Sequence, residues 1–207
     1  SGAHACTLHW TNNDGEVKAG DLILVDAGVE LDSLYTADVT RTIPVNGKFT
    51  PAQRALYELT LKAQLAAIKS IRPGVRWNKP HEVTVKVITE GLVKLGLLKG
   101  KPADLIKSGA YRDFYMHRAG HWLGLDVHDV GAYRLGEHHV ELEPGMVLTV
   151  EPGLYVSDRL PVPEGQPEIG ECWKGIGIRI EDDVAVTDHG HENLTASALK
   201  TPAALER

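Results

Sequence analysis

The segment Met116–Gly131, with the sequence MHRAGHWLGLDVHDVG, is the stretch around which the rest of the chain must be arranged. It places His117, His121 and His128 among two aspartates and three glycines. Imidazole is well suited to binding a metal or exchanging a proton near neutral pH, and glycine lets a ligand approach the backbone. Side chains alternate along a strand, so His121 and His128 reach one pocket only if the chain bends between them, and Gly124 is the expected place. The alternative is a strand broken by glycine whose histidines are surface residues or satisfied core residues.

Length and composition indicate one domain. The 207 residues are 43% hydrophobic, which is enough for one sizeable core. The net charge of -6 and the lack of a basic run argue against a nucleic-acid partner. No apolar run approaches the roughly 20 residues that span a bilayer and no signal-peptide pattern opens the sequence, so we expect no membrane partner and a cytoplasmic location. Cys6 and Cys172 lack the spacing of a disulfide framework or a thiolate zinc site.

The first residues have an unusual pattern. There is no initiator methionine, and SGAHACTLHW runs directly into a strand-like pattern over His4–Trp10, as though the sequence were cut from a longer one. Polar residues at 12–15 and 18–21 then predict two turns.

Two carboxylates are predicted to meet on neighbouring strands. The run DLILVDAGVEL (21–31) is apolar on both faces except at Asp26, so this carboxylate is expected in an otherwise buried strand. Asp38 lies in a second β-rich run, and two antiparallel strands would bring the two carboxylates side by side. Adjacent carboxylates repel unless a proton or a cation lies between them. The alternative is that Asp38 is a turn residue and that Asp26 pairs with Arg41.

Helices are predicted between this hairpin and the histidine-rich segment. Thr50 is a candidate N-cap with Gln53 three residues later, and apolar residues recur at helical spacing until Pro73 and Gly74 end the run. A second helix is expected near 81–95 and a short helical turn near 103–107. The two long helices are most simply scaffold, and we expect His81 to be exposed to solvent.

Two polar stretches follow the histidine-rich segment. Residues 134–143 are predicted to form a loop in which His138 and His139 are exposed. Residues 157–174 are rich in proline, glycine and charge and are predicted to leave the core.

Two further carboxylates are predicted on strands. MVLTVEPG is a strand whose end carries Glu151, and IGIRIEDD alternates so that Arg179 and Glu181 share a face. The candidate ligands are thus four carboxylates and one imidazole: Asp26, Asp38, His121, Glu151 and Glu181. Carboxylates that converge in a β core would repel one another, but two divalent cations between them make a good site. Oxygen-rich ligation with one imidazole suits Mn²⁺, Co²⁺, Fe²⁺ or Zn²⁺.

Five motifs, in order along the chain, resemble those of a known family. They are VDAG, ADVTRTIPVNGKFTPAQ, HWLGLDVHDVG, TVEPG and GIRIEDD, and the likeness runs from about His9 to Ala196. The family is that of the pita-bread dinuclear metallopeptidases, and the most similar branch is that of the Xaa-Pro aminopeptidases (aminopeptidase P). The resemblance implies an α+β pita-bread fold: a curved, mostly antiparallel β-sheet with helices packed on its outer face.

The resemblance also implies that part of the domain is missing. Relatives begin well before this sequence does, so residues 1–207 would be a catalytic domain that lacks its first elements and a separate N-terminal domain. We expect it to pack with the upstream segment or with another copy of the chain, and the intact protein to be a homo-oligomer. Asp26 and Asp38 are twelve residues apart, one more than is usual, so a bulge or a longer turn must absorb one residue. The segment 157–174 is longer than the common link and is expected to form a surface loop near the site.

The metal site that the resemblance implies holds two ions, most simply Mn²⁺, with Co²⁺, Zn²⁺ or Fe²⁺ as alternatives. Asp26 would chelate one ion, Asp38 and Glu181 would bridge both, and His121 and Glu151 would complete the other. A hydroxide held by both ions would attack a peptide that has proline in second position, which releases the N-terminal residue. Glu151 would take its proton and pass it to the leaving nitrogen.

Four more residues receive roles from the resemblance. His9 and His128 would hydrogen-bond the scissile carbonyl, and His117 would line the pocket on the proline side. Arg179 would orient a metal-bound carboxylate. Two other readings stay open: a prolidase that cleaves Xaa-Pro dipeptides, and a pita-bread module that binds partners without catalysis. Modules of the second kind typically lack the metal ligands, whereas all five positions here hold competent side chains.

Overall fold

The computed structural model describes residues 1–206, and it combines helices with strands, as the predicted α+β class requires. The helices are α1 (Pro51–Lys69), α2 (Lys79–Lys94), α3 (Pro102–Ser108) and α4 (Pro202–Leu205), and short 3-10 helices cover Gly2–Cys6 (η1), Ala110–Asp113 (η2) and Glu171–Trp173 (η3). The helices predicted from Thr50, near 81–95 and near 103–107 are confirmed. None of the helices within residues 1–206 is long and apolar enough to cross a membrane.

The strands form antiparallel pairs throughout. They are β1 (Leu22–Glu30), β2 (Thr36–Pro44), β3 (Leu123–Gly124), β4 (Val127–His128), β5 (Arg134–Leu135), β6 (His138–His139), β7 (Val147–Val150), β8 (Gly153–Val156), β9 (Ile176–Arg179), β10 (Asp182–Thr187) and β11 (Gly190–Asn193). β1 pairs with β2, β8 with β9, and β10 lies between β7 and β11. The mostly antiparallel sheet expected from the sequence is therefore confirmed.

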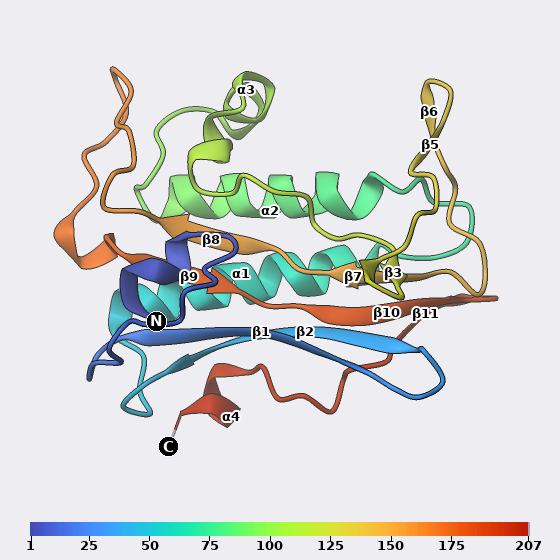
Figure 1. Cartoon of the computed structure of the whole chain (residues 1–207). Coiled ribbons are helices and arrows are strands. Elements are labelled where there is room, and N and C mark those ends of the chain that lie inside the picture. The colour runs from blue at the N-terminus through green and yellow to red at the C-terminus, as the bar shows by residue number, and fades with distance from the viewer. Residues whose placement is uncertain (207) are drawn as a thin grey trace.

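Hydrogen bonds outside these pairs join the strands into one row (Figure 1). The Glu181 amide donates to the Thr40 carbonyl, which links the β9–β10 run to β2. On the other side β7 and β8 pair with β10 and β9, and the Thr149 amide donates to the His121 carbonyl. The order across the row is β1, β2, β9–β10, β7–β8 and the segment around His121. Residues far apart in sequence thus become neighbours.

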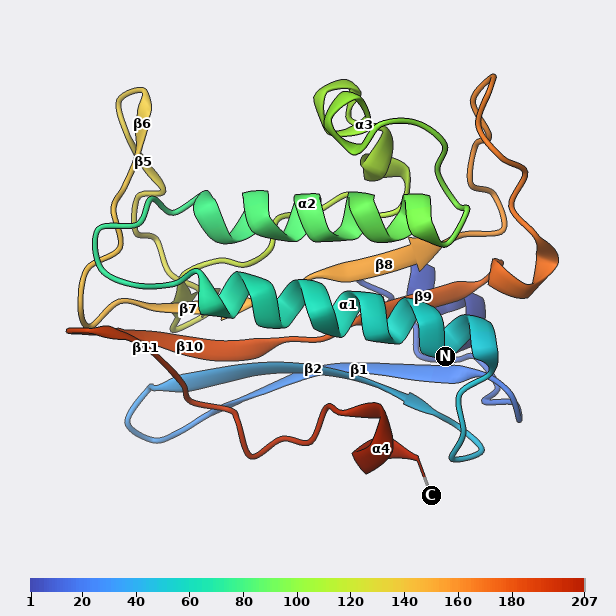
Figure 2. The same ribbon diagram turned by 180° about the vertical axis from the view of Figure 1, so that it is seen from behind.

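The long helices form the scaffold on one face of this row (Figure 2). A capping box in which Thr50 and Gln53 bond each other's backbone amides begins α1. α1 contacts β7, β8 and β9, and α2 packs against α1. Gly91 permits this close packing, because a Cβ there would lie 2.2 Å from the Leu59 side chain. Leu56 is among the fully buried core residues, and burying one such side chain contributes about 1.5–3 kcal/mol.

The strand predicted over His4–Trp10 is wrong. The chain instead forms η1, in which the His4 amide donates to Ser1 and the Thr7 amide to His4, so its backbone bonds are local. The Ala5 carbonyl lies directly over Gly177 of β9, where a Cβ would meet it at 2.2 Å. The absence of a side chain at Gly177 lets η1 pack closely against β9.

The expectation that β1 is buried on both faces is also wrong. Val25 and Val29 are 48% and 59% exposed, and within residues 1–206 this strand pairs only with β2. The register of the hairpin is unbroken, with Asp26 opposite Thr40 and Gly28 opposite Asp38. The extra residue between the two aspartates is therefore absorbed in the turn over 31–35 rather than in a bulge.

The two polar stretches differ in outcome. Residues 157–174 contain no strand and only the short η3, as predicted. Residues 134–143 contain the small hairpin of β5 and β6 rather than a loop without structure, and it stands out from the strand row (Figure 1). His138 is exposed as expected, but His139 is half-buried and its Nδ1 has no hydrogen-bond partner among the described residues. Its place at the base of the hairpin, beside Val140, explains the partial burial.

Candidate metal centre

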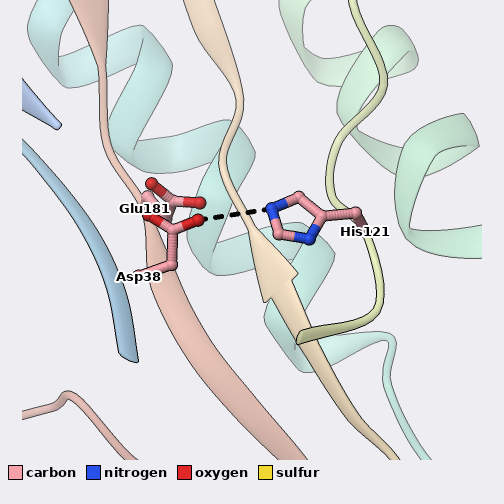
Figure 3. Close-up of side chains that lie close together, drawn as sticks. All are labelled: Asp38, His121 and Glu181. Atoms are coloured by element: carbon pink, nitrogen blue, oxygen red, sulfur yellow. Dashed lines mark ion pairs between the residues drawn. The ribbon is translucent and has the colours of Figure 1, made fainter. Parts of the chain in front are cut away.

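Three metal-ligating side chains meet at the middle of the strand row. One ligand atom from each of Asp38, His121 and Glu181 lies within 4.8 Å of the other two (Figure 3). His121 Nε2 lies 3.3 Å from Asp38 Oδ2. Asp38 belongs to β2, Glu181 to the junction of β9 and β10, and His121 to the segment beside β7. The row of strands thus places a nitrogen and two carboxylates around one point.

His121 is held so that one ring nitrogen faces the carboxylates. Its Nδ1 lies 2.9 Å from the Trp122 carbonyl, which fixes the proton on Nδ1 and leaves Nε2 directed at the site. The His121 amide also donates to Thr149 Oγ1 at 3.0 Å. Burial would lower the pKa of His121, but the Asp38 carboxylate and the Trp122 carbonyl outweigh burial and raise that pKa. The ring therefore sits in a field of negative charge.

Glu151 and Glu181 are carboxyls that resist ionisation in this site. Burial raises the pKa of Glu151 to about 7, and Glu151 Oε1 lies 3.7 Å from His121 Nε2. Burial, with the charges of Glu151 and Asp38, raises the pKa of Glu181 to about 10. Asp38 differs: burial would raise its pKa, but its hydrogen bond with His121 outweighs burial and lowers that pKa. The acidic side chains of the site outnumber the basic ones, so they do not all ionise together without a cation.

Asp26 approaches the cluster from β1 and is paired with Arg179. Arg179 Nη2 donates to Asp26 Oδ2 at 2.6 Å, and Arg179 Nη1 donates to the Tyr155 hydroxyl at 2.9 Å. Asp26 is close enough to Asp38 that a hydrogen bond between them helps lower the pKa of Asp38. The alternative pairing of Asp26 with Arg41 is wrong, because Arg41 binds Asp182 on the opposite face. Arg179 is 2% exposed, so its guanidinium is shielded from water and binds Asp26 and Tyr155 instead.

The remaining predicted histidines line a groove beside the cluster. The groove has a volume of about 360 Å³, and its walls include His9, His117, His121, His128 and Glu151. His117 Nε2 lies 2.9 Å from the Tyr155 hydroxyl, and the rings of His121 and His128 are 4.2 Å apart. A second hollow of about 500 Å³ opens between the N-terminal segment and β1, and its walls include His9, Asp26 and Arg179. The space next to the cluster suits a ligand of peptide size.

The chain reverses at Gly124, where the sequence analysis required a bend. β3 ends at Gly124, the turn occupies 125–126, and β4 brings His128 opposite Leu123. Val127 adopts φ of 65°, a left-handed conformation that is uncommon for a β-branched residue. A Cβ at Gly124 would lie 2.4 Å from the Asp129 amide nitrogen, so only glycine fits this tight turn. The reversal allows His121 and His128 to face one groove.

Hydroxyl groups near the ligands were not identified from the sequence. Thr40 Oγ1 donates to Glu181 Oε2 at 2.6 Å, and Arg179 Nε donates to Thr40 Oγ1 at 3.4 Å. This confirms that Arg179 and Glu181 share a face. Thr149 Oγ1 donates to Glu151 Oε1 at 3.4 Å. The available signal was strand alternation, because Thr40 and Thr149 each lie two residues from a candidate ligand on the same face.

His81 is not exposed to solvent, contrary to the sequence-based expectation. Its ring lies beside that of Tyr115, and Nδ1 is 3.5 Å from the Tyr115 hydroxyl. Burial, with the charges of Arg118 and Arg112, lowers the pKa of His81 to about 4. The first turn of α2 faces the histidine-rich segment rather than water, and helical periodicity alone does not reveal that neighbour.

The donor set fits divalent cations. It combines carboxyl oxygens with one imidazole nitrogen, and its acidic groups outnumber its basic ones. The raised pKa values of Glu151 and Glu181 mark the repulsion that a cation would relieve. Because Nδ1 faces the Trp122 carbonyl, His121 directs Nε2 at the site, and this nitrogen could bind a metal once its proton is released.

Sequence comparison defines the class of protein. Residues 1–188 match the model of metallopeptidase family M24, and the chain belongs to this family. Divalent metal ions are therefore implied for the site. The fold is the pita-bread fold, and the helices cover its outer face.

Within family M24, the chain is 50% identical over 206 residues to the Xaa-Pro aminopeptidase of Escherichia coli (strain K12), covering 100% of this chain and 45% of that protein. It superposes on the solved structure of Pseudomonas aeruginosa aminopeptidase PepP with a TM-score of 0.92 and 55% identity, covering 99% of this chain and 45% of that one. A structure of zinc-substituted Escherichia coli aminopeptidase P in complex with product has a TM-score of 0.91 and 48% identity, covering 99% of this chain and 44% of that one. The chain thus spans less than half the length of the relatives it matches.

Proposed function

We propose that this chain supplies the dimetal catalytic site of an aminopeptidase that releases the N-terminal residue from peptides with proline in second position. The observation that carries the proposal is the convergence of Asp38, His121 and Glu181 on one point, with Glu151 and Asp26 beside them. The names of relatives that are about half identical to the chain support the same reaction. All five ligand positions hold competent side chains, which favours an enzyme over a module that only binds partners.

Two divalent ions are proposed for the site. Asp26 would hold one ion, Asp38 and Glu181 would bridge the two, and His121 with Glu151 would complete the other. When bound, divalent cations polarise a carbonyl and activate a water molecule for attack at neutral pH. We propose Mn²⁺, with Co²⁺, Zn²⁺ or Fe²⁺ as alternatives, because oxygen-rich ligation with one imidazole suits each of them. The zinc-substituted form of the Escherichia coli relative is consistent with exchange of the ion in that protein.

Glu151 is proposed as the group that moves the proton. Its carboxyl lines the groove beside His121, where it can reach a water molecule and the bound substrate. It would take the proton of the attacking water and deliver it to the leaving nitrogen of proline. Thr149 Oγ1, 3.4 Å from Glu151 Oε1, helps hold the carboxyl toward the groove.

The groove histidines are proposed to hold the substrate. His9 and His128 line the groove from opposite segments and would hydrogen-bond the scissile carbonyl as negative charge develops on it. His117 would bound the pocket on the proline side, held there by its contact with Tyr155. Arg179 would keep the Asp26 carboxylate pointed at the metal.

Further polypeptide is proposed to cover β1. Val25 and Val29 on β1, and Leu31 directly after it, are between 48% and 59% exposed, and within residues 1–206 β1 pairs only with β2. An exposed apolar edge strand is a template for pairing. We propose that an upstream segment or a second copy of the chain covers this edge in a homo-oligomeric, cytoplasmic enzyme. A stable and active monomer of residues 1–207 alone would contradict this part of the proposal.

Hydrolysis of matched peptides tests the reaction. The full-length enzyme loaded with Mn²⁺ should release the first residue from Xaa-Pro-Xaa tripeptides and longer peptides, and should leave the corresponding Xaa-Ala-Xaa peptides largely intact. Chelation should abolish the activity and added Mn²⁺ should restore it. Cleavage restricted to Xaa-Pro dipeptides would identify a prolidase instead. Activity that is unchanged by chelation would contradict a metallopeptidase mechanism.

A further inference from the structure

The C-terminal segment, residues 194–206, continues from β11 along the β1–β2 hairpin to α4 (Figure 1, Figure 2). Arg54 Nη1 donates to Glu206 Oε2 at 2.6 Å, and the Tyr57 hydroxyl donates to the Lys200 carbonyl at 2.9 Å. The segment is therefore tied to α1. Its remaining contacts converge on a charged cluster that the proposed reaction does not use.

Asp182 is the centre of this cluster. Its side chain is fully buried, and both oxygens are satisfied by donors from four different parts of the chain. Oδ1 accepts from Arg41 Nη2 at 2.7 Å, and Oδ2 accepts from Gln64, Asn193 and Lys200. A buried carboxylate is tolerated only when it is paired and hydrogen-bonded in this way.

Arg41 joins the cluster to the backbone that carries the metal ligands. Its five N–H groups are all used: Nε donates to the Leu199 carbonyl, Nη1 to the Thr40 and Glu181 carbonyls, and Nη2 to Asp182 and the Ala198 carbonyl. The bond from Nη1 to the Glu181 carbonyl is 2.6 Å long. A guanidinium whose five donors are all engaged is held in one orientation, because no other rotamer preserves all five hydrogen bonds.

The cluster and the metal site lie on opposite faces of the same two strands. Side chains alternate along a strand, so Arg41 and Asp182 point backward where their neighbours Thr40 and Glu181 point into the site. Thr40 Oγ1 also donates to Glu181 Oε2 at 2.6 Å. The separation between β2 and the Glu181 backbone is thus fixed from behind by Arg41 and from the front by Thr40.

We propose that Arg41 and Lys200 are positioning residues for the metal site, and that docking of the C-terminal segment sets its affinity for divalent cations. Lys200 binds Asp182 and, at 2.8 Å, Gln64 Oε1, so it fastens the segment to the cluster. Arg41 contacts both Asp182 and the Glu181 carbonyl, so it links the position of the segment to that of Glu181. This inference rests on the proposed dimetal site, and it adds that residues with no contact to metal or substrate determine how tightly the ions are held.

Lys200→Met in the full-length protein tests the inference. The substitution removes the charge but keeps most of the length of the Lys200 side chain, which is 14% exposed. Mn²⁺ binding, measured by titration calorimetry, should weaken by about 10-fold, the lower range for loss of a group that orients metal ligands. Lys200→Arg should recover most of the affinity. Lys86→Met, at an exposed position on α2, is the matched control and should bind as the unaltered protein does.

Two outcomes separate this inference from a purely structural role and from failure of the proposed function. A melting temperature of the metal-free Lys200→Met protein that falls while Mn²⁺ affinity stays within about two-fold would overturn the inference and leave the proposed function intact. If Lys200→Met does not fold, Arg41→Lys, which keeps the charge but cannot make five bonds, takes its place and must weaken Mn²⁺ binding. An unaltered protein that binds no Mn²⁺ would overturn the proposed function and the inference together.

Discussion

The hydroxyl of Thr40 donates a hydrogen bond to Glu181 Oε2 over 2.6 Å, and Thr40 stands directly opposite Asp26 in the β1–β2 hairpin. One small side chain therefore links strands that carry three of the candidate ligands, because Asp38 lies two residues away on the same face. The arrangement shows that the carboxylates are held by a network of buried polar groups as well as by the backbone.

Replacing Thr40 by Val should weaken metal binding with little change in shape. Valine has nearly the same volume but leaves Glu181 Oε2 without its donor, so we expect about 10-fold weaker Mn²⁺ binding by titration calorimetry. Thr84→Val is the matched control. Thr84 is equally buried on α2, but its hydroxyl has no partner within residues 1–206, so its loss should be neutral or slightly stabilising. Equal effects of the two substitutions would count against the role of the Thr40 hydroxyl.

Replacing Glu151 by Gln should abolish hydrolysis while the fold survives. Glutamine keeps the shape and can still accept from Thr149, but it does not carry a proton between water and the leaving nitrogen. We expect kcat to fall by about 100- to 10,000-fold in a peptide-release assay, with an unchanged far-UV circular dichroism spectrum. Turnover close to that of the unaltered enzyme would remove Glu151 from its assigned role.

Replacing Arg179 by Met should destabilise the fold through Asp26 and Tyr155. Arg179 is buried, and its loss removes charge-assisted hydrogen bonds to Asp26 and Tyr155. Because the Asp26 side chain is 36% exposed, water replaces part of this contact, and we expect a cost of about 1.5–3 kcal/mol in the free energy of unfolding. Urea denaturation of the metal-free protein measures this value. Arg54→Met removes an ion pair whose arginine is 42% exposed, and it should cause a much smaller loss. A loss at Arg179 no larger than the loss at Arg54 would show that the contacts of the buried guanidinium do not stabilise the fold.

His81 should make stability depend on pH between about 6.5 and 4. Its pKa is lowered from 6.5 to about 4 in the folded state, chiefly by burial, so in this window the unfolded chain binds a proton that the folded chain excludes. Stability is therefore highest above pH 6.5 and falls as the pH decreases toward 4. His81→Gln should flatten part of this slope in melting experiments from about pH 7 to pH 4. An identical slope in the variant would mean that His81 does not titrate as described.

The sequence predicted the elements whose signals are local. The capping box at Thr50 and Gln53 defined the start of α1, and Gly124 defined the reversal that turns His121 and His128 toward one groove. The candidate ligands were recognised because carboxylates in apolar strands are costly unless something balances their charge.

Features that depend on a distant neighbour were missed. The His4–Trp10 pattern resembled a strand, but the backbone there packs on Gly177, which is far away in sequence. His81 was expected to be exposed to solvent because the sequence of α2 does not indicate that Tyr115 packs beside it. Burial of β1 was overestimated because apolar alternation shows that a strand has faces to cover but does not show what covers them.

The carboxylates around His121 are proposed to hold two divalent cations between them. Crystals of the full-length protein grown with Mn²⁺ test this proposal most directly, through anomalous scattering measured at the manganese edge and elemental analysis of the same preparation. We expect two manganese ions per chain, with Asp38 and Glu181 between them, His121 and Glu151 on one, and Asp26 on the other. No anomalous peak among these side chains at saturating Mn²⁺, or a peak that none of them contacts, would contradict the account.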